Sequence, residues 1–262
     1  MFERQPPPYP AAHDLLSGKR IVITAAAGVG IGFAIARRCM EEGATVMISD
    51  VRVERLSRAA QSLRELTDRP APFTQLCDVS SQQDVEALFA AAQQQMGGID
   101  VVMNNAGIGG DTPILAMADA EWQRMLDVTL TGTFRMTREA FRYMQPQGSG
   151  VIVNNASFYG WRAVKGQAHY AAAKAGVMAL TRCAAVEGAE FGVRVNAVAP
   201  SGAIHDKMRE KQTQQFLQEA AARMVQKRPS ETWEVATVMV FLASEYSSYM
   251  TGEILPVSDQ HA

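Results

Sequence analysis

The chain has 262 residues, of which 47% are apolar and 20% charged, and its formal net charge at pH 7 is −2. This balance predicts a globular protein with a substantial core, and it offers no basic face for nucleic acid or for an anionic membrane. No apolar run approaches the roughly 20 residues that a membrane span requires. The three cysteines lie far apart and the four histidines lack ligand spacing, so we expect neither a disulfide framework nor a metal site.

Residues 1–17 form the first distinct stretch. They carry Pro6-Pro7-Pro8 and Pro10, which favour an extended tail, and they lack the apolar core of a secretory signal. We therefore expect a cytoplasmic protein in which residues 18–262 form one domain.

A phosphate-binding turn is predicted directly after the tail. Residues 21–24 have the apolar character of a buried strand, a glycine-rich stretch follows at 25–32, and a helical pattern begins at Phe33. A strand, a glycine-rich turn and a helix in this order present backbone amides and a helix dipole to a pyrophosphate. The glycine spacing differs from GxGxxG, so the motif depends on this context. The candidate residues are Thr24, Ala26, Gly28, Gly30, Ile31 and Gly32.

Asp50 ends the next apolar run and lies eighteen residues after Gly32. At this distance a carboxylate would accept hydrogen bonds from the ribose hydroxyls of an adenosine. The alternative is that Asp50 caps the helix that follows. Arg52, two residues further on, could instead meet a phosphate on that ribose.

Strand and helix patterns continue to alternate along the chain. Further strands are predicted at 73–76, 99–103, 151–153, 193–198 and 254–257. Helices are predicted at 53–66, 84–96, 119–143, 167–190 and 233–243. Repeated strand–helix units with short connections are typical of an α/β fold with a doubly wound parallel sheet, which binds ligands at the carboxyl ends of its strands. Residues 203–230 depart from this pattern and show no strand.

A set of three residues that follow the strand at 151–153 suggests proton transfer. Ser157 follows the carboxyl end of that strand, and Tyr170 and Lys174 lie four residues apart on one helix face. An ammonium beside a phenol lowers its pKa, so we expect Tyr170 to exchange a proton while Ser157 holds the reacting oxygen. The alternative for an isolated YxxxK is a plain helix surface. A serine hydrolase that uses Ser157 and His169 is disfavoured, because GxSxG is absent.

Taken in order, these motifs resemble the short-chain dehydrogenase/reductase family over roughly residues 17–258. The resemblance rests on the glycine-rich turn, Asp78, the stretch 104–107, the Ser157, Tyr170 and Lys174 set, and the stretch 196–200. It implies a Rossmann-type doubly wound sheet of about seven strands with helices on both faces, a nicotinamide cofactor and often a homotetramer. It also implies that Tyr170 is the acid/base, that Lys174 binds the nicotinamide ribose and that Ser157 binds the substrate oxygen.

The resemblance extends the expected cofactor site beyond the glycine-rich turn and Asp50. Its further members are Asp78, Val79, Asn105, Ala106, Gly107, Tyr170, Lys174, Pro200 and Ser201. Asp50 would repel a 2′-phosphate, so we expect NAD rather than NADP, while Arg52 keeps NADP open.

The sequence departs from the family pattern at four places. Ala25 replaces the first glycine of the turn, which is one residue longer than usual, and Thr129 replaces a common asparagine. Pro200 is followed by Ser201 instead of glycine, and Ser258-Asp259-Gln260 stands where the family usually has Asp-Gly-Gly near the end of the chain. Thr129 can still hydrogen-bond a water, so it stays a candidate for the proton relay. We interpret the departures as the mark of a branch of the family.

That branch resembles the dehydrogenases and reductases of steroid-ring breakdown that act on bicyclic CoA thioesters. We therefore expect interconversion of a secondary alcohol and a ketone on a small-molecule substrate of that kind, covered by residues 203–230. The alternatives are a 3-oxoacyl-thioester reductase and a non-catalytic dinucleotide-binding regulator. Basic residues at 207–228 could meet CoA phosphates or simply form a solvated helix face. The candidate substrate contacts are Phe158, His205 and Met208.

Overall fold

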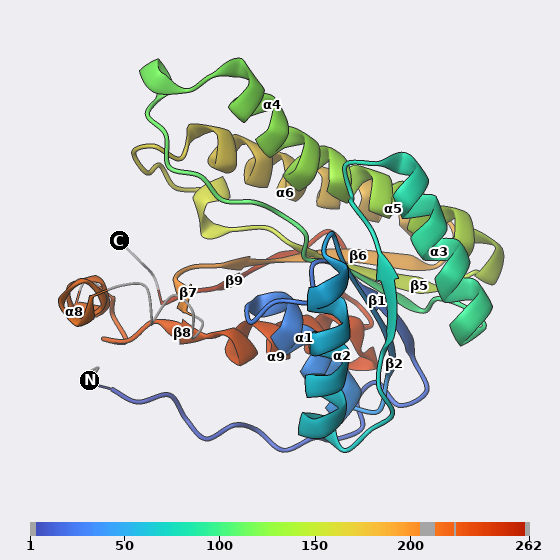
Figure 1. Cartoon of the computed structure of the whole chain (residues 1–262). Coiled ribbons are helices and arrows are strands. Elements are labelled where there is room, and N and C mark those ends of the chain that lie inside the picture. Colours follow the sequence, from blue (N-terminus) through green and yellow to red (C-terminus); the bar gives the residue numbers. More distant parts are fainter. Residues whose placement is uncertain (1–3, 205–212, 223, 260–262) are drawn as a thin grey trace.

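The computed structural model describes residues 4–204, 213–222 and 224–259. Its centre is a parallel sheet of seven strands in the order β3-β2-β1-β4-β5-β6-β9 (Figure 1). The strands are β1 (Arg20–Ile23), β2 (Thr45–Asp50), β3 (Phe73–Leu76), β4 (Val101–Asn104), β5 (Gly150–Asn155), β6 (Val193–Pro200) and β9 (Ile254–Val257). The chain winds outward from β1 to β3 and then in the opposite direction from β4, so the strand order reverses between β1 and β4. The predicted doubly wound α/β fold is confirmed.

Helices cover both faces of this sheet (Figure 1). One face packs against α1 (Ile31–Glu41), α2 (Val53–Thr67) and α9 (Thr232–Ala243), and the other against α3 (Gln82–Met96), α5 (Gly132–Gln147) and α6 (Ala168–Ala189). Successive residues of β1 explain the two cores, because Ile21 and Ile23 belong to one and Val22 to the other. Coverage of both faces is the reason that central strands such as β1 and β4 are continuous apolar runs.

The helix predicted over 119–143 is two helices. A π-helical turn at Asp127–Thr131 separates α4 (Asp119–Leu126) from α5. Gly132 follows the turn, and a Cβ at this glycine would lie 2.6 Å from the Val79 side chain. The chain at Gly132 therefore passes directly against Val79, which follows β3. Thr129 lies within the turn and is fully buried, and such turns are frequent at functional sites.

Residues 5–14 form no helix or strand, and they pack against the domain. The Tyr9 hydroxyl donates a hydrogen bond of 2.7 Å to Glu41 of α1, and its ring lies 5.5 Å from that of Trp233 at the start of α9. Glu42, which is fully buried, accepts hydrogen bonds from the backbone amides of His13 and Leu15. These contacts connect the stretch to two helices of one face.

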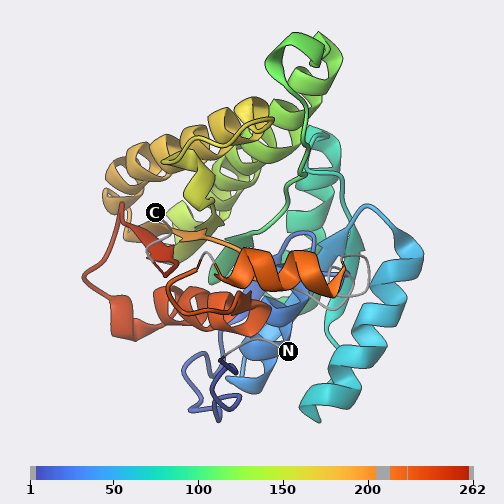
Figure 2. The ribbon, with the colours of Figure 1, turned by 90° about the vertical axis from the view of Figure 1, so that its left-hand side faces the viewer.

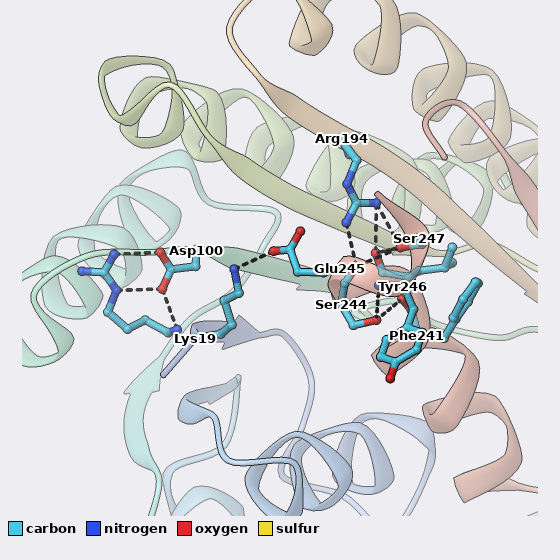
Figure 3. Close-up of polar contacts among 10 residues, drawn as sticks. Lys19, Asp100, Arg194, Phe241, Ser244, Glu245, Tyr246 and Ser247 are labelled. Atoms are coloured by element: carbon cyan, nitrogen blue, oxygen red, sulfur yellow. Dashed lines mark hydrogen bonds and ion pairs between the residues drawn. The ribbon is translucent and has the colours of Figure 1, made fainter. Parts of the chain in front are cut away.

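Ion pairs and helix caps hold the amino edge of the sheet together. Arg20 of β1 makes a bidentate contact with Asp100, which precedes β4, at 2.8 and 2.7 Å. Arg194 of β6 donates to Ser247 Oγ and to the Ser244 carbonyl, both at 3.1 Å, beyond the end of α9 (Figure 3). These contacts consolidate the edge opposite to the carboxyl ends of the strands.

Residues 203–230, predicted without strands, begin and end in a two-residue parallel pairing of β7 (Ala203–Ile204) with β8 (Ser230–Glu231). Between these strands lies α8 (Gln214–Ala222), which crosses the carboxyl edge of the sheet in Figure 2. No helix in the described ranges is long and apolar enough to cross a membrane.

Candidate active site

Two adjoining cavities open at the carboxyl ends of the strands. The larger, of about 940 Å³, is lined by the glycine-rich turn, by Asp50 and by the three proposed catalytic residues Ser157, Tyr170 and Lys174. The smaller, of about 660 Å³, shares Asp50 with the first and adds Asp78. Other predicted cofactor residues that line one or both are Gly28, Gly30, Ile31, Gly32, Val79, Asn105, Ala106, Gly107, Pro200 and Ser201. The structure therefore brings most of the predicted site residues together.

The glycine-rich turn approaches its neighbours so closely that side chains would not fit. A Cβ at Gly32 would lie 2.3 Å from the Ala25 carbonyl oxygen and 2.5 Å from Asn105 Nδ2. Gly30 caps α1 without a side-chain hydrogen bond, which leaves the first-turn amides available to an anion. Ala25 has φ +50°, a left-handed conformation that favours glycine, and this explains why glycine is usual at that position.

Thr24 and Ala26 are buried and do not line the cavities. The Thr24 hydroxyl accepts hydrogen bonds from the backbone amides of Asn105 at 3.0 Å and of Ala106 at 2.9 Å. Thr24 thus connects β1 to the segment after β4, so its structural role is to hold the two walls of the site in register.

Asp50 is 8% exposed and lines both cavities. Its carboxylate accepts one hydrogen bond of 3.2 Å from the backbone amide of Arg52. Arg52 is the residue that caps α2, and the cap has no side-chain hydrogen bond, so the alternative role of Asp50 as a helix cap is not realised. The arginines that line the larger cavity are Arg55 and Arg58 of α2 rather than Arg52.

Ser157 and Tyr170 lie together in the wall of the larger cavity. Burial raises the pKa of the Tyr170 hydroxyl, and a hydrogen bond with Ser157 opposes this shift. The Lys174 ammonium lies 5.7 Å from the centre of the Tyr170 ring and donates a hydrogen bond of 2.6 Å to the Asn155 carbonyl. The expected lowering of the Tyr170 pKa by Lys174 is therefore wrong for this structure, because desolvation dominates and the ammonium is directed at the Asn155 carbonyl rather than at the Tyr170 hydroxyl.

Lys174 is 4% exposed, and no carboxylate within the described ranges pairs with it. Burial lowers the pKa of its ammonium from 10.5 to about 8. A buried cation whose one described acceptor is a carbonyl has unused hydrogen-bonding capacity, which a polar ligand in the cavity could satisfy.

Thr129 lies beside the cavities without lining them. Its hydroxyl accepts a hydrogen bond of 3.4 Å from the backbone amide of Ile108. A Cβ at Gly107 would lie 3.6 Å from Thr129 Oγ1 and 3.5 Å from Lys174 Nζ, so these two residues flank the same glycine. In this structure Thr129 supports a wall of the larger cavity.

The predicted substrate contacts are only partly within the described ranges. His205 and Met208 lie outside them, and Phe158 does not line either cavity. Tyr159 takes that place, with its ring 6.1 Å from that of Tyr170 and nearly perpendicular to it. The sequence analysis missed Tyr159 and Gln167. The available signal was that Tyr159 directly follows the predicted Phe158 and that Gln167 lies three residues before Tyr170.

Comparisons with known proteins agree with this arrangement. A family model described as enoyl-(acyl carrier protein) reductase matches residues 25–259. The chain is 53% identical, over 96% of both chains, to the (5R,7aS)-5-hydroxy-7a-methyl-1-oxo-2,3,5,6,7,7a-hexahydro-1H-indene-carboxyl-CoA reductase of Mycobacterium tuberculosis. It is also similar to a crystal structure of a short chain dehydrogenase from Mycobacterium smegmatis, with 48% identity, a TM-score of 0.87 and coverage of 98% and 99% of the two chains. The chain belongs to the short-chain dehydrogenase/reductase family.

This short-chain dehydrogenase/reductase is therefore an oxidoreductase that uses a nicotinamide dinucleotide. A 7α-hydroxysteroid dehydrogenase solved with NADH and 7-oxo glycochenodeoxycholic acid has a TM-score of 0.88 with it at 28% identity, over 95% and 96% of the chains. The residues present fit the cofactor, since the turn at Gly32 admits only a glycine and Asp50 offers free acceptors. Among the described residues, no group of His, Cys, Asp or Glu could hold a metal ion.

Proposed function

We propose that this enzyme interconverts a secondary alcohol and a ketone on a bulky cyclic acyl-CoA of the type met in steroid-ring breakdown. The observation that carries the chemistry is the pair of hydroxyls of Ser157 and Tyr170 in the larger cavity, with the buried Lys174 beside them. The similarity to an indene-carboxyl-CoA reductase supports the bicyclic thioester.

In this proposal Tyr170 carries the proton. Its raised pKa keeps the hydroxyl protonated near pH 7, so it acts as an acid that protonates the carbonyl oxygen during reduction and as a base in the reverse direction. A nicotinamide dinucleotide, when bound, supplies or accepts the hydride at the substrate carbon. Ser157 donates a hydrogen bond to the same substrate oxygen and so fixes its position beside Tyr170. Lys174 orients the cofactor ribose and adds positive charge near the reacting oxygen.

We further propose a preference for NAD(H). The Asp50 carboxylate would accept hydrogen bonds from ribose hydroxyls and would repel a 2′-phosphate. Arg55 is half-buried and Arg58 exposed, and both line the cavity that contains Asp50. They would attract such a phosphate, so NADP(H) is expected to bind more weakly without being excluded.

Small residues in the cavity wall support a cyclic substrate. This wall contains Gly107, Gly109 and Gly110, which have no side chains to fill the space, and Tyr159 provides an aromatic ring. A 3-oxoacyl-thioester reductase needs the same catalytic residues with a straighter pocket, and 37% identity to a 3-oxoacyl-[acyl-carrier-protein] reductase of Thermotoga maritima keeps it as the second candidate. The intact set of catalytic residues favours both enzymes over a non-catalytic regulator.

A substrate comparison tests the proposal. A bicyclic hydroxy-acyl-CoA and acetoacetyl-CoA are assayed with NAD(H) and NADP(H), with the free acids as controls. We expect the highest kcat/KM for the bicyclic thioester. Equal rates on the free acid and the thioester would contradict the CoA part, and a preference for acetoacetyl-CoA would contradict the ring part.

We also propose a homotetramer. Large apolar side chains are exposed on helices of the α5–α6 layer, with Phe134 of α5 at 42% and Val186 of α6 at 73% exposure, and a partner subunit would cover them. Light scattering coupled to size-exclusion chromatography tests this, and a monomer at micromolar concentration would contradict it.

A further inference from the structure

His169 directly precedes Tyr170 in the first turn of α6, and no described role accounts for it. Its side chain is fully buried, and neither ring nitrogen has a hydrogen-bond partner among the described residues. Buried polar atoms without partners are uncommon in folded proteins, so this imidazole calls for an explanation.

The ring lies between the start of α4 and the loop that follows β4. His169 Nε2 is 3.5 Å from Glu121 Oε1 of α4. A Cβ at Gly110 would lie 2.5 Å from the same nitrogen and 3.5 Å from the Met125 side chain, so only a glycine lets the loop pass over the ring. Glu121 Oε1 also accepts a hydrogen bond of 2.5 Å from the Thr112 hydroxyl. One carboxylate oxygen thus faces both the loop and the imidazole.

The same loop is tied to the residues just before α6. Gln167 Nε2 donates a hydrogen bond of 2.6 Å to the Gly110 carbonyl, and the Thr112 amide donates one of 2.9 Å to the Gly166 carbonyl. Residues 107–110 of the loop line the larger cavity, as does Gln167. Because three of these four loop residues are glycines, the wall has little stiffness of its own. Its position depends on the contacts that hold it.

We propose that His169 and Glu121 form a clasp that positions residues 107–112 over the substrate at Tyr170. This inference rests on the proposed function, since it assumes that the substrate reacts in this cavity. The separation of 3.5 Å is slightly too long for a hydrogen bond. A shift of roughly 0.5 Å would let Nε2–H donate to Glu121 and fix the loop from below. His169 is therefore a positioning residue that acts through Glu121 and Thr112.

Kinetics of matched variants test the clasp. We expect His169→Leu to raise the KM for the ketone about tenfold, with kcat and the Kd for NADH each within about threefold of the wild type. His169→Gln, whose amide reaches about as far as Nε2, should restore KM to within about threefold of the wild type. Glu121→Ala should raise KM similarly, and the double variant His169→Leu/Glu121→Ala no further. Asp119→Asn, an exposed carboxylate two residues before Glu121, should have no effect.

A second measurement does not need a substrate. Hydrogen exchange of the backbone amides at 107–112 should be faster in His169→Leu than in the wild type and restored in His169→Gln, while the melting temperature shows that each variant is folded. A wild-type exchange rate and KM in His169→Leu would overturn the clasp, and so would equal defects in the Leu and Gln variants, which would indicate a packing role. If the wild type reduces no bicyclic thioester but the exchange result holds, the substrate proposal fails and the clasp stands.

Discussion

Lys174→Met should remove activity and at the same time stabilise the fold. Lys174 is 4% exposed, and its pKa falls from 10.5 to about 8 on burial, so the folded protein carries the charge of this ammonium at pH 7 at a cost. At 1.36 kcal/mol per pKa unit the cost is about 3 kcal/mol, which a methionine of similar volume avoids. The variant also leaves the Asn155 carbonyl without its donor, which costs about 1–2 kcal/mol. The net expectation is a stabilisation of about 1–2 kcal/mol.

The pH dependence provides the sharper measurement. Below pH 8 Lys174 is charged in both the folded and the unfolded states, so the full cost is present. Between pH 8 and 10.5 the unfolded chain binds more protons than the folded one, so wild-type stability rises and the advantage of the variant shrinks. Urea unfolding at pH 7 and pH 10 measures both. Lys165→Met, an exposed lysine in the loop before α6, is the control and should show no such change. A variant less stable than the wild type at pH 7, or an advantage constant with pH, would refute the reasoning.

Three further predictions concern the cofactor and proton-transfer sites. Tyr170→Phe should lower kcat about 10²–10⁴-fold, because only the exchanging proton is lost, while the Kd for NADH measured by fluorescence stays within about twofold; turnover near the wild-type rate would remove Tyr170 from the mechanism. Asp50→Ser should shift the ratio of kcat/KM for NADPH to kcat/KM for NADH about tenfold or more toward NADPH, and Arg55→Gln should shift it toward NADH. Arg52 does not line the cavity, so Arg52→Gln is the control. No shift in Asp50→Ser would contradict the ribose contact. Gly32→Ala should weaken NADH binding at least about tenfold in calorimetry because its Cβ would displace the Ala25 carbonyl, and normal affinity would show that the turn can yield.

The parts of this protein that could be predicted from its sequence are those fixed by local periodicity. The apolar run at 21–24 predicts β1, and four-residue spacing is enough to place Tyr170 and Lys174 on one helix face. The position of Asp50 follows equally well, since the carboxyl ends of parallel strands meet at one edge of the sheet. Each of these depends on residues close together in the chain.

Other features depend on contacts between segments that are far apart in the chain, and local sequence patterns do not predict such contacts. Arg55 enters the cavity because α2 packs beside the glycine-rich turn, whereas its neighbour Arg52 does not. Tyr9 contacts Trp233 although more than two hundred residues separate them in the chain. The direction of the Tyr170 pKa shift is of the same kind, because desolvation depends on everything that surrounds the hydroxyl.

The burial that sets the pKa values of the site residues also lowers the stability of the fold. Burial favours the neutral form of both proposed catalytic groups, raising the pKa of Tyr170 and lowering that of Lys174. For Tyr170 this is useful, since reduction of a ketone needs a protonated acid. For Lys174 it is unfavourable, since a cation is held where one carbonyl is its described acceptor. A polar ligand in the cavity could offset the cost of burying this cation. Enzymes commonly trade stability for activity in this way.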